Sequence, residues 1–326
     1  MKNLIAKIVP FLALISPAMA NDSVAEIGAG GIQFVYTGDI QMVREDLYIS
    51  ADEIRVDYIF RNISGTDITR LIAFPMPDIT PDPFSDIGLP YEADNFLGFS
   101  VSVNGARVEP QLQQRASIVG VDVTSQLIKR GVPLFPSGAR VLEALEMQPP
   151  GSLANLMQAG AVFVDTYDVG NGMVDHMSPA WTLHSIYYWE MDFPAGKDIL
   201  VSHVYSPAVG ATAGLSETFF EGEAITSDYA QRYCVDDGFV GAVHRKIAGG
   251  AQFFENWISY ILVTGQNWYG NIGTFHLTVD KGSANNLVSF CGDGVTKTGP
   301  TTFELTIENY FPDRNLDILL LQDVGR

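Results

Sequence analysis

The segment Glu53-Ile54-Arg55-Val56-Asp57-Tyr58-Ile59-Phe60 places an apolar side chain at every even position and a charged one at most odd positions. Successive side chains of a β-strand point to opposite faces, so this period of two predicts a strand with one face in the core. The same alternation recurs at Leu97, Phe99, Val101 and Val103. Strand patterns of this kind run through most of the chain and favour a mainly β fold.

The alternation that begins at Leu97 stops at Asn104-Gly105. Both residue types tolerate positive φ, which predicts a two-residue hairpin turn into a strand at Ala106–Glu109. Upstream, the segment Phe74–Pro83 contains four prolines. Proline has no N–H to donate to a strand ladder, so we expect this segment to be an extended surface loop.

Between residues 121 and 160 the apolar side chains recur at helical spacing, which predicts two or three short helices. We expect Ser137 and Ser152 to be their N-caps and Gly131 and Gly160 to mark their ends. These helices would form an insertion between two groups of strands.

The C-terminal half returns to strand patterns. Trp181–Phe193 and Ile199–Tyr205 flank the turn Pro194-Ala195-Gly196, which predicts a second hairpin. Further strands are expected at Trp257–Thr264, Phe275–Val279, Phe303–Ile307 and Leu316–Leu321. One more helix is expected over Asp228–Ile247, capped by Ser227 and ended by Gly249-Gly250.

The expected organisation is a signal peptide at residues 1–20, an N-terminal β region at 21–118, a helical insertion at 119–165 and a C-terminal β region at 166–326. The fold class is therefore mainly β, with one or two packed antiparallel β-sandwich regions, a short helical insertion and one further helix near 228–247.

The first twenty residues have the three parts of a cleavable secretory signal. Lys2 and Lys7 supply the charged region, Ile8–Ile15 the apolar run and Ser16–Ala20 a small-residue cleavage site, so we expect cleavage after Ala20. The apolar run is far shorter than the roughly 20 residues that span a bilayer, and no transmembrane segment is expected in the mature chain. The protein is expected to be exported, to the periplasm rather than the medium.

The chain is strongly acidic, with 38 acidic against 19 basic residues and a formal net charge of −19. Such a surface repels nucleic acid and anionic lipid. We therefore expect no nucleic-acid partner. Acidic loops at Asp78, Asp82 and Asp86, at Asp236-Asp237 and at Asp293 could gather oxygens for Ca²⁺, but none follows the EF-hand spacing. No cofactor is expected, and solvated turns are the favoured interpretation of these loops.

Cys234 and Cys291 are the two cysteines of the chain. An even cysteine count in an exported protein predicts a disulfide between them. The alternative is a nucleophilic Cys234 activated by His244, which lies ten residues further along the expected helix.

No sequence motif identifies a catalytic site. The chain lacks GxSxG, SxxK, the HExxH zinc spacing and a phosphate-binding glycine loop. Asp175-His176-Met177-Ser178 brings suitable residue types together, but real triads assemble from distant segments. His203 shares a strand face with Val201 and Tyr205, which favours a hydrogen-bonded core histidine. We therefore name no catalytic, cofactor-binding or metal-binding residue.

Aromatic residues gather at Trp181, Tyr187, Tyr188 and Trp189, and again at Trp257, Trp268 and Tyr269. They are expected to belong to the core, and the alternative is a stacking platform or a protein interface.

Several short motifs are similar to those of an exported bacterial family of unknown function, family 4424. They are Asn21-Asp22-Ser23 with Gly30-Gly31, Glu45-Asp46-Leu47 with Ile49-Ser50, Ala73–Ile79, Phe193–Gly196, His203–Pro207, Tyr233-Cys234, Asp280–Gly282 and Val288–Cys291. The resemblance implies export and a shared fold along nearly the whole mature chain. It implies no activity, substrate or catalytic residue.

Two functions remain open at this point. The first is a non-enzymatic binding or structural module of the bacterial cell envelope, which binds an unknown protein or envelope ligand. The alternative is a periplasmic or secreted hydrolase that acts on envelope glycans or peptides through acidic residues and histidines from distant segments.

Overall fold

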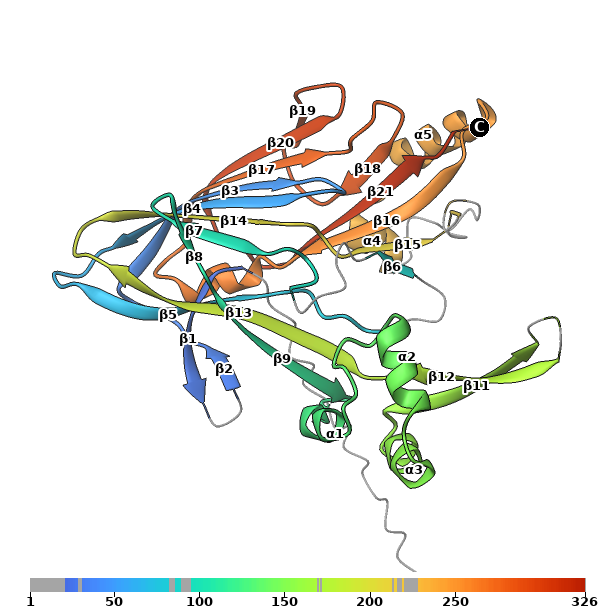
Figure 1. Ribbon diagram of the computed structural model, residues 1–326. Coiled ribbons are helices and arrows are strands. Elements are labelled where there is room, and N and C mark those ends of the chain that lie inside the picture. The colour runs from blue at the N-terminus through green and yellow to red at the C-terminus, as the bar shows by residue number, and fades with distance from the viewer. Residues whose placement is uncertain are drawn as a thin grey trace, which may run out of the picture.

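The computed structural model describes residues 21–28, 31–81, 86–88, 95–168, 170, 172–212, 214–215, 219 and 228–325. Within them the chain is mainly β, with several antiparallel sheets packed together and five α-helices (Figure 1). The predicted fold class is therefore confirmed. No helix among the described residues has the length and apolarity needed to cross a bilayer.

An eight-stranded sheet forms one layer. Its members are β3 (Ile40–Ile49), β4 (Ile54–Asn62), β7 (Ser100–Val103), β8 (Ala106–Val108), β14 (Asp198–Tyr205), β17 (Ile272–Asp280), β19 (Thr296–Lys297) and β20 (Thr302–Tyr310). The order is β19-β20-β17-β3-β4-β14-β7-β8. All neighbours are antiparallel except β3 and β17, which pair in parallel.

A six-stranded sheet forms the second layer. Its members are β1 (Ser23–Gly28), β2 (Gly31–Phe34), β5 (Ile68–Pro75), β9 (Gln111–Ile118), β10 (Val121–Asp122) and β13 (Thr182–Phe193). The order is β10-β9-β13-β5-β1-β2. Strands from before and after the helical insertion are thus neighbours in both large sheets.

Two smaller sheets complete the strands. The five-stranded sheet contains β6 (Asp86–Gly88), β15 (Val209–Thr212), β16 (Phe253–Tyr260), β18 (Leu287–Phe290) and β21 (Leu316–Asp323), in the order β18-β21-β16-β15-β6. The last is a two-stranded ribbon of β11 (Val162–Asp168) and β12 (Met173–Pro179).

The helices lie in two groups. The helices of the insertion are α1 (Thr124–Lys129), α2 (Ala139–Glu146) and α3 (Pro150–Gln158), and the later pair is α4 (Asp228–Tyr233) and α5 (Asp237–Ala248). A short 3-10 helix, η3 (Val263–Asn267), follows β16. Figure 1 shows α2 and α3 beside the β11–β12 ribbon, away from α4 and α5.

The main core lies between the two large sheets. Ile54, Val56, Tyr58 and Phe60 of β4 are at most 1% exposed, which confirms the inward face predicted from their alternation. The hairpin of β7 and β8 is also confirmed, with φ values of 50° at Asn104 and 79° at Gly105.

One glycine is fixed by a close approach between β3 and β17. The pairing of β3 with β4 shifts between Met42 and Arg44, which marks a bulge. Gly273 of β17 lies so close to the carbonyl oxygen of Val43 that a Cβ atom at this position would overlap it. The bulge therefore leaves room only for a residue without a side chain at position 273.

The expected surface loop at Phe74–Pro83 was wrong for its first half. Phe74, Met76 and Ile79 are at most 2% exposed, and Ile79 forms a β-bridge with Leu183. The prolines stop regular pairing, but the apolar residues between them still fill the core. Residues 82 and 83 lie outside the described residues.

The predicted serine N-caps were also wrong. Gly138 precedes α2 and Pro149 precedes α3, and neither helix has a side-chain cap. The predicted ends at Gly131 and Gly160 are confirmed, since both have positive φ directly after a helix.

The helix expected over residues 228–247 is two helices. Cys234 has a φ of +52°, and this left-handed conformation ends α4. Asp236 then caps α5 by accepting a hydrogen bond of 2.7 Å from the amide of Phe239. The end at Gly249-Gly250 is confirmed, and Ser227 lies outside the described residues.

Candidate functional site

The segment Asn21–Ser23 lies inside the core, with all three residues at 0% exposure. The Thr264 hydroxyl donates to the Asn21 carbonyl at 2.9 Å, and the Trp268 indole donates to the Asp22 carbonyl at 2.8 Å. The Asn267 amide donates to the Ser23 hydroxyl at 2.9 Å. Residues of η3 and its end therefore hold the first described residues in place.

Glu45 of β3 is buried in contact with this segment. The Asn21 side-chain amide lies 3.3 and 3.2 Å from its two carboxylate oxygens, and the Tyr260 hydroxyl donates to one of them at 3.3 Å. Tyr58 completes the network, donating to Asn21 Oδ1 at 2.5 Å and lying 3.0 Å from the Tyr260 hydroxyl. Burial raises the pKa of Glu45 to about 8, although the bonds from Asn21 and Tyr260 oppose the rise.

A second buried acid pairs with a histidine. Asp22 Oδ2 lies 3.0 Å from His203 Nε2, and neither side chain is exposed. Burial raises the pKa of Asp22, and the imidazole opposes this shift. The rings of Phe74, Phe99 and Trp189 surround His203, with centroids 4.9 to 5.4 Å away.

Several buried polar atoms of this region have no hydrogen-bond partner among the described residues. They are Asp22 Oδ1, His203 Nδ1 and the Tyr205 hydroxyl, and Trp189 Nε1 beside His203 is a fourth. Because every group of the cluster is sealed in the core, a substrate could reach it only if the two sheets separated. The prediction of a buried, hydrogen-bonded His203 is confirmed. Its partner Asp22 was missed because no alternation of apolar and polar residues marks a core position at the start of β1.

A different histidine is accessible to solvent. Ser117 Oγ of β9 lies 2.7 Å from His184 Nε2 of β13, and His184 Nδ1 lies 2.7 Å from Asp78 Oδ1. The His184 and Asp78 side chains are 36% and 32% exposed. Thr182 sits directly opposite Ser117 in the strand pairing. A hydroxyl, an imidazole and a carboxylate linked in this order can activate the hydroxyl as a nucleophile.

The Ser117–His184–Asp78 chain comes from three distant segments, so no local motif could predict it. The acidic-loop pattern indicated Asp78 only as a possible Ca²⁺ ligand. Among the described residues no group of three or more His, Cys, Asp or Glu side chains is arranged to hold a metal ion. Asp82 lies outside these residues.

The helical insertion contains an open cavity of about 440 Å³ between α1, α2 and α3. Its lining is Lys129, Arg130, Gly131, Ala144, Met147, Gln148, Pro149 and Ser152, which includes two cations and no carboxylate. Arg130 is held by a bond of 3.1 Å to the Ser152 hydroxyl and one of 2.9 Å to the Gln126 carbonyl.

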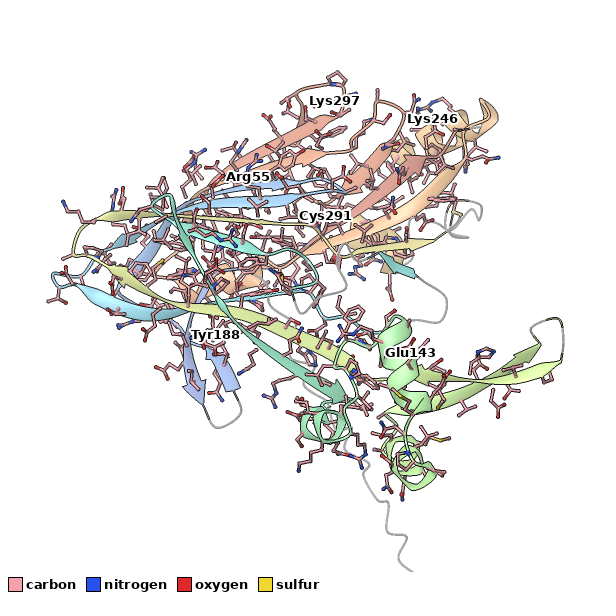
Figure 2. All side chains as sticks on the ribbon, viewed as in Figure 1. Arg55, Glu143, Tyr188, Lys246, Cys291 and Lys297 are labelled. Carbon is pink, nitrogen blue, oxygen red and sulfur yellow. A yellow bond between two sulfur atoms is a disulfide. The ribbon has the colours of Figure 1, made fainter. Side chains whose placement is uncertain are left out.

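The β11–β12 ribbon extends from this insertion and packs mainly against α2 and α3. Figure 2 shows its side chains pointing outward, with Glu143 labelled on the neighbouring α2. Asp175 and His176 are consecutive on β12, so they point to opposite faces. The local Asp175–Ser178 grouping therefore does not converge on one point.

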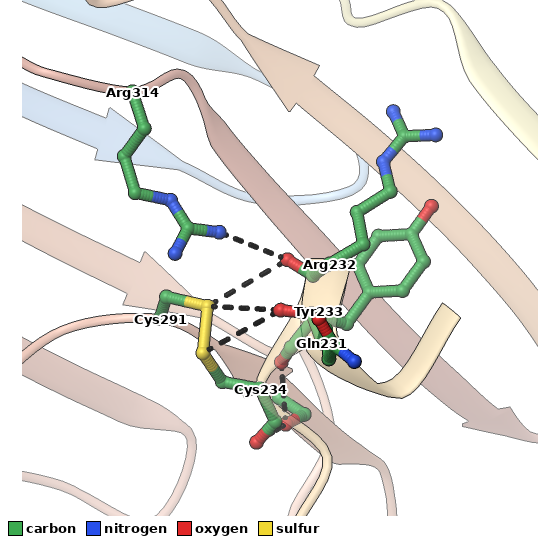
Figure 3. Close-up of a disulfide and its surroundings, with 7 residues drawn as sticks. Gln231, Arg232, Tyr233, Cys234, Cys291 and Arg314 are labelled. Atoms are coloured by element: carbon green, nitrogen blue, oxygen red, sulfur yellow. Dashed lines mark hydrogen bonds between the residues drawn. A yellow bond between two sulfur atoms is a disulfide. The ribbon is translucent and has the colours of Figure 1, made fainter. Parts of the chain in front are cut away.

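Cys234 and Cys291 form the predicted disulfide, with their Cα atoms 5.1 Å apart. Figure 3 shows the sulfurs beside main-chain oxygens at the end of α4, and Arg314 donates to the Arg232 carbonyl at 3.3 Å. The disulfide overturns the nucleophilic alternative for Cys234. His244 lies instead 2.6 Å from the Phe219 carbonyl oxygen.

The predicted aromatic clusters are largely core. Trp181, Tyr187, Trp189 and Trp268 are at most 4% exposed, so they offer no platform. Tyr269 is 46% exposed, and Tyr188 bonds to Gln111 at the surface.

A family model described as "Domain of unknown function (DUF4424)" matches residues 20–319. No curated protein matches the chain. Among solved structures, this chain is similar, at 15% identity, to the crystal structure of a protein from Legionella pneumophila subsp. pneumophila str. Philadelphia 1. Nutrient binding is provisionally attributed to that protein. The match has a TM-score of 0.49 and covers 93% of this chain and 70% of that one.

Proposed function

The chain belongs to the DUF4424 family, for which no activity is described. We propose that it is an exported, non-enzymatic binding module of the bacterial cell envelope. Its binding face is the helical insertion together with the β11–β12 ribbon. The periplasm is the proposed compartment, on the basis of the N-terminal signal pattern and the disulfide.

The observation that carries this proposal is the distribution of exposed apolar side chains. Of the eighteen large hydrophobic residues exposed among the described residues, ten fall between positions 119 and 174. They are Val119, Val121, Ile128, Leu142, Met147, Met157, Phe163, Val164, Met173 and Val174. Single exposed apolar residues are ordinary, but their concentration in this one stretch of the chain favours an interaction surface.

The cavity in the insertion indicates the chemistry of the ligand. Lys129 and Arg130 have no carboxylate partner among the described residues, in a chain whose net charge is −19. Met147, which is 76% exposed, supplies apolar surface beside them. This combination favours a ligand with an anionic group attached to an apolar segment.

Titration calorimetry with dodecanoate below its micelle concentration tests the proposal. Lys129→Gln and Met147→Ser should each weaken binding roughly 5-fold, because each removes about 1 kcal/mol of contact. The matched controls are Lys297→Gln and Phe311→Ser, which change an exposed lysine and an exposed aromatic residue elsewhere. Absent binding, or equal losses in the controls, would contradict an anionic apolar ligand and leave a protein partner as the occupant of this face.

A hydrolase is the second candidate, and the Ser117–His184–Asp78 chain favours it. In this mechanism Ser117 Oγ bonds to an acyl carbon while its proton passes to His184 Nε2. The imidazole then gives that proton to the leaving alcohol as the old C–O bond breaks, and water releases the acyl group by the same steps in reverse. Asp78 holds the imidazole in the required orientation.

Turnover of p-nitrophenyl acetate and labelling by a fluorophosphonate test this candidate. Both should depend on Ser117 and disappear in Ser117→Ala, while Ser100→Ala, a strand serine of the other large sheet, should retain them. Equal turnover in Ser117→Ala and the unsubstituted protein would eliminate the hydrolase.

A further inference from the structure

Glu45 is a buried acid without a cation. Its side chain is 0% exposed, and no Lys, Arg or His among the described residues forms an ion pair with it. Its contacts are the neutral amide of Asn21 and the hydroxyl of Tyr260. A carboxylate that is removed from water stays ionised only beside a compensating positive charge, and without one it keeps its proton at a cost in stability.

The sequence offers a group that can supply a positive charge beside Glu45. Asn21 is the residue that directly follows the expected cleavage site after Ala20. Its side chain already touches both carboxylate oxygens of Glu45, so its backbone nitrogen lies one short side chain away from them. In the uncut chain that nitrogen is a neutral amide, whereas cleavage converts it into an ammonium group.

We propose that the core contains an internal binding site for the chain's own amino terminus, in which the α-ammonium of Asn21 is the counter-ion of Glu45. The proposal rests on the export part of the proposed function, because signal removal creates the ammonium group. Removal of the signal then completes the core as well as releasing the protein.

The hydrogen bonds around Asn21 fit this role. Tyr58 and Thr264 bind its side-chain and main-chain oxygens, so the residue is fixed at both ends. A precursor with a neutral amide at this position carries an uncompensated acid in its core. The uncut chain is therefore less stable than the mature chain, which suits a protein that crosses a membrane before it folds.

Four purified chains test the pairing. A removable fusion gives one chain that begins at Asn21 and one that retains an Ala20 whose own amino group is acetylated, each with either Glu45 or Glu45→Gln. The chain that begins at Asn21 should melt at least about 5 °C above the chain that retains Ala20. Glu45→Gln should lower the Tm of the first chain, since it leaves the ammonium unpaired, and raise or leave unchanged that of the second.

The opposite effects of Glu45→Gln on the Tm of the two chains distinguish an ion pair from a side chain that is only buried. Glu26→Gln is the matched control, because Glu26 lies on β1 close to the terminus but is exposed. Equal effects of Glu45→Gln in both chains, or equal Tm values with and without Ala20, would overturn the proposal. Because these chains are prepared in vitro, that result would leave the export proposal untouched, and the N-terminal mass of the cellular protein tests export separately.

Discussion

Asp22 and His203 form a fully buried pair, with 3.0 Å between the carboxylate and the imidazole, although 181 residues separate them in sequence. The pair connects the first described residues to β14, an interior strand of the eight-stranded sheet. It lies beside the Asn21–Glu45 contact, so the amino-terminal segment functions as part of the core.

We expect Asp22→Ala to destabilise the fold strongly. The substitution leaves the His203 imidazole buried without its partner, a change that typically costs about 3 kcal/mol or more. Urea unfolding followed by tryptophan fluorescence measures the loss. Asp52→Ala, at an exposed turn, is the control, and a loss no larger than that of the control would show that the pair contributes little.

Stability should fall with rising pH in a chain that retains Ala20. Burial raises the pKa of Glu45 to about 8, whereas the unfolded chain ionises near the ordinary value of 4.5. Between these pH values the native state keeps a proton that the unfolded state has lost, so the free energy of unfolding decreases as the pH rises. The other titratable groups facing Glu45 are Asp22, Asp46, Tyr58, Tyr260 and Tyr310.

The chain that begins at Asn21 should lose less stability over the same pH range, because the ammonium favours the ionised carboxylate. Urea midpoints measured at pH 5 and pH 8 give the comparison. Parallel pH profiles for the two chains would contradict the pairing.

Reduction of the disulfide should destabilise the protein. Cys234 and Cys291 are 57 positions apart, and closing a loop of this length is worth about 4 kcal/mol on the chain-entropy model. Thermal unfolding with and without a reducing agent measures the effect, and the Cys234→Ser, Cys291→Ser double variant should match the reduced protein and no longer respond to reductant. An unchanged Tm on complete reduction would contradict this role.

Gly273→Ala should destabilise the junction of β3 and β17. Its Cβ would overlap the Val43 carbonyl, so the bulge must move and part of the parallel pairing is lost. Gly65→Ala is the control, since no atom lies within 4 Å of a Cβ added there. Thermal unfolding of the two variants should therefore differ by several degrees, whereas equal Tm values would mean that the bulge adapts freely.

Local patterns predicted much of the fold. The alternation in β4 and the Asn104-Gly105 turn identified their elements because both depend on side chains close in sequence. The predictions of serine caps and of one continuous helix over residues 228–247 were wrong, because Gly138 and Pro149 precede α2 and α3 and because α4 ends at Cys234. In the second case the left-handed Cys234, tied to Cys291, separates α4 from α5.

Most residues of the candidate sites could not be predicted from local sequence patterns. Only the cysteine pair could be predicted, from the even cysteine count and the expected export. Ser117, His184 and Asp78 meet through strand pairing across β9 and β13, and Glu45 meets Asn21 only when the two large sheets close on each other. Such contacts require the three-dimensional arrangement, because no spacing in the sequence encodes them.

Native mass spectrometry of the protein from the envelope fraction of its own cells tests the binding proposal most directly. We predict a chain that begins at Asn21, with an intact disulfide and an additional bound mass that is reduced in Lys129→Gln and Met147→Ser but retained in Lys297→Gln. A bare chain, or a bound mass that persists equally in all variants, would contradict the helical insertion as the binding face.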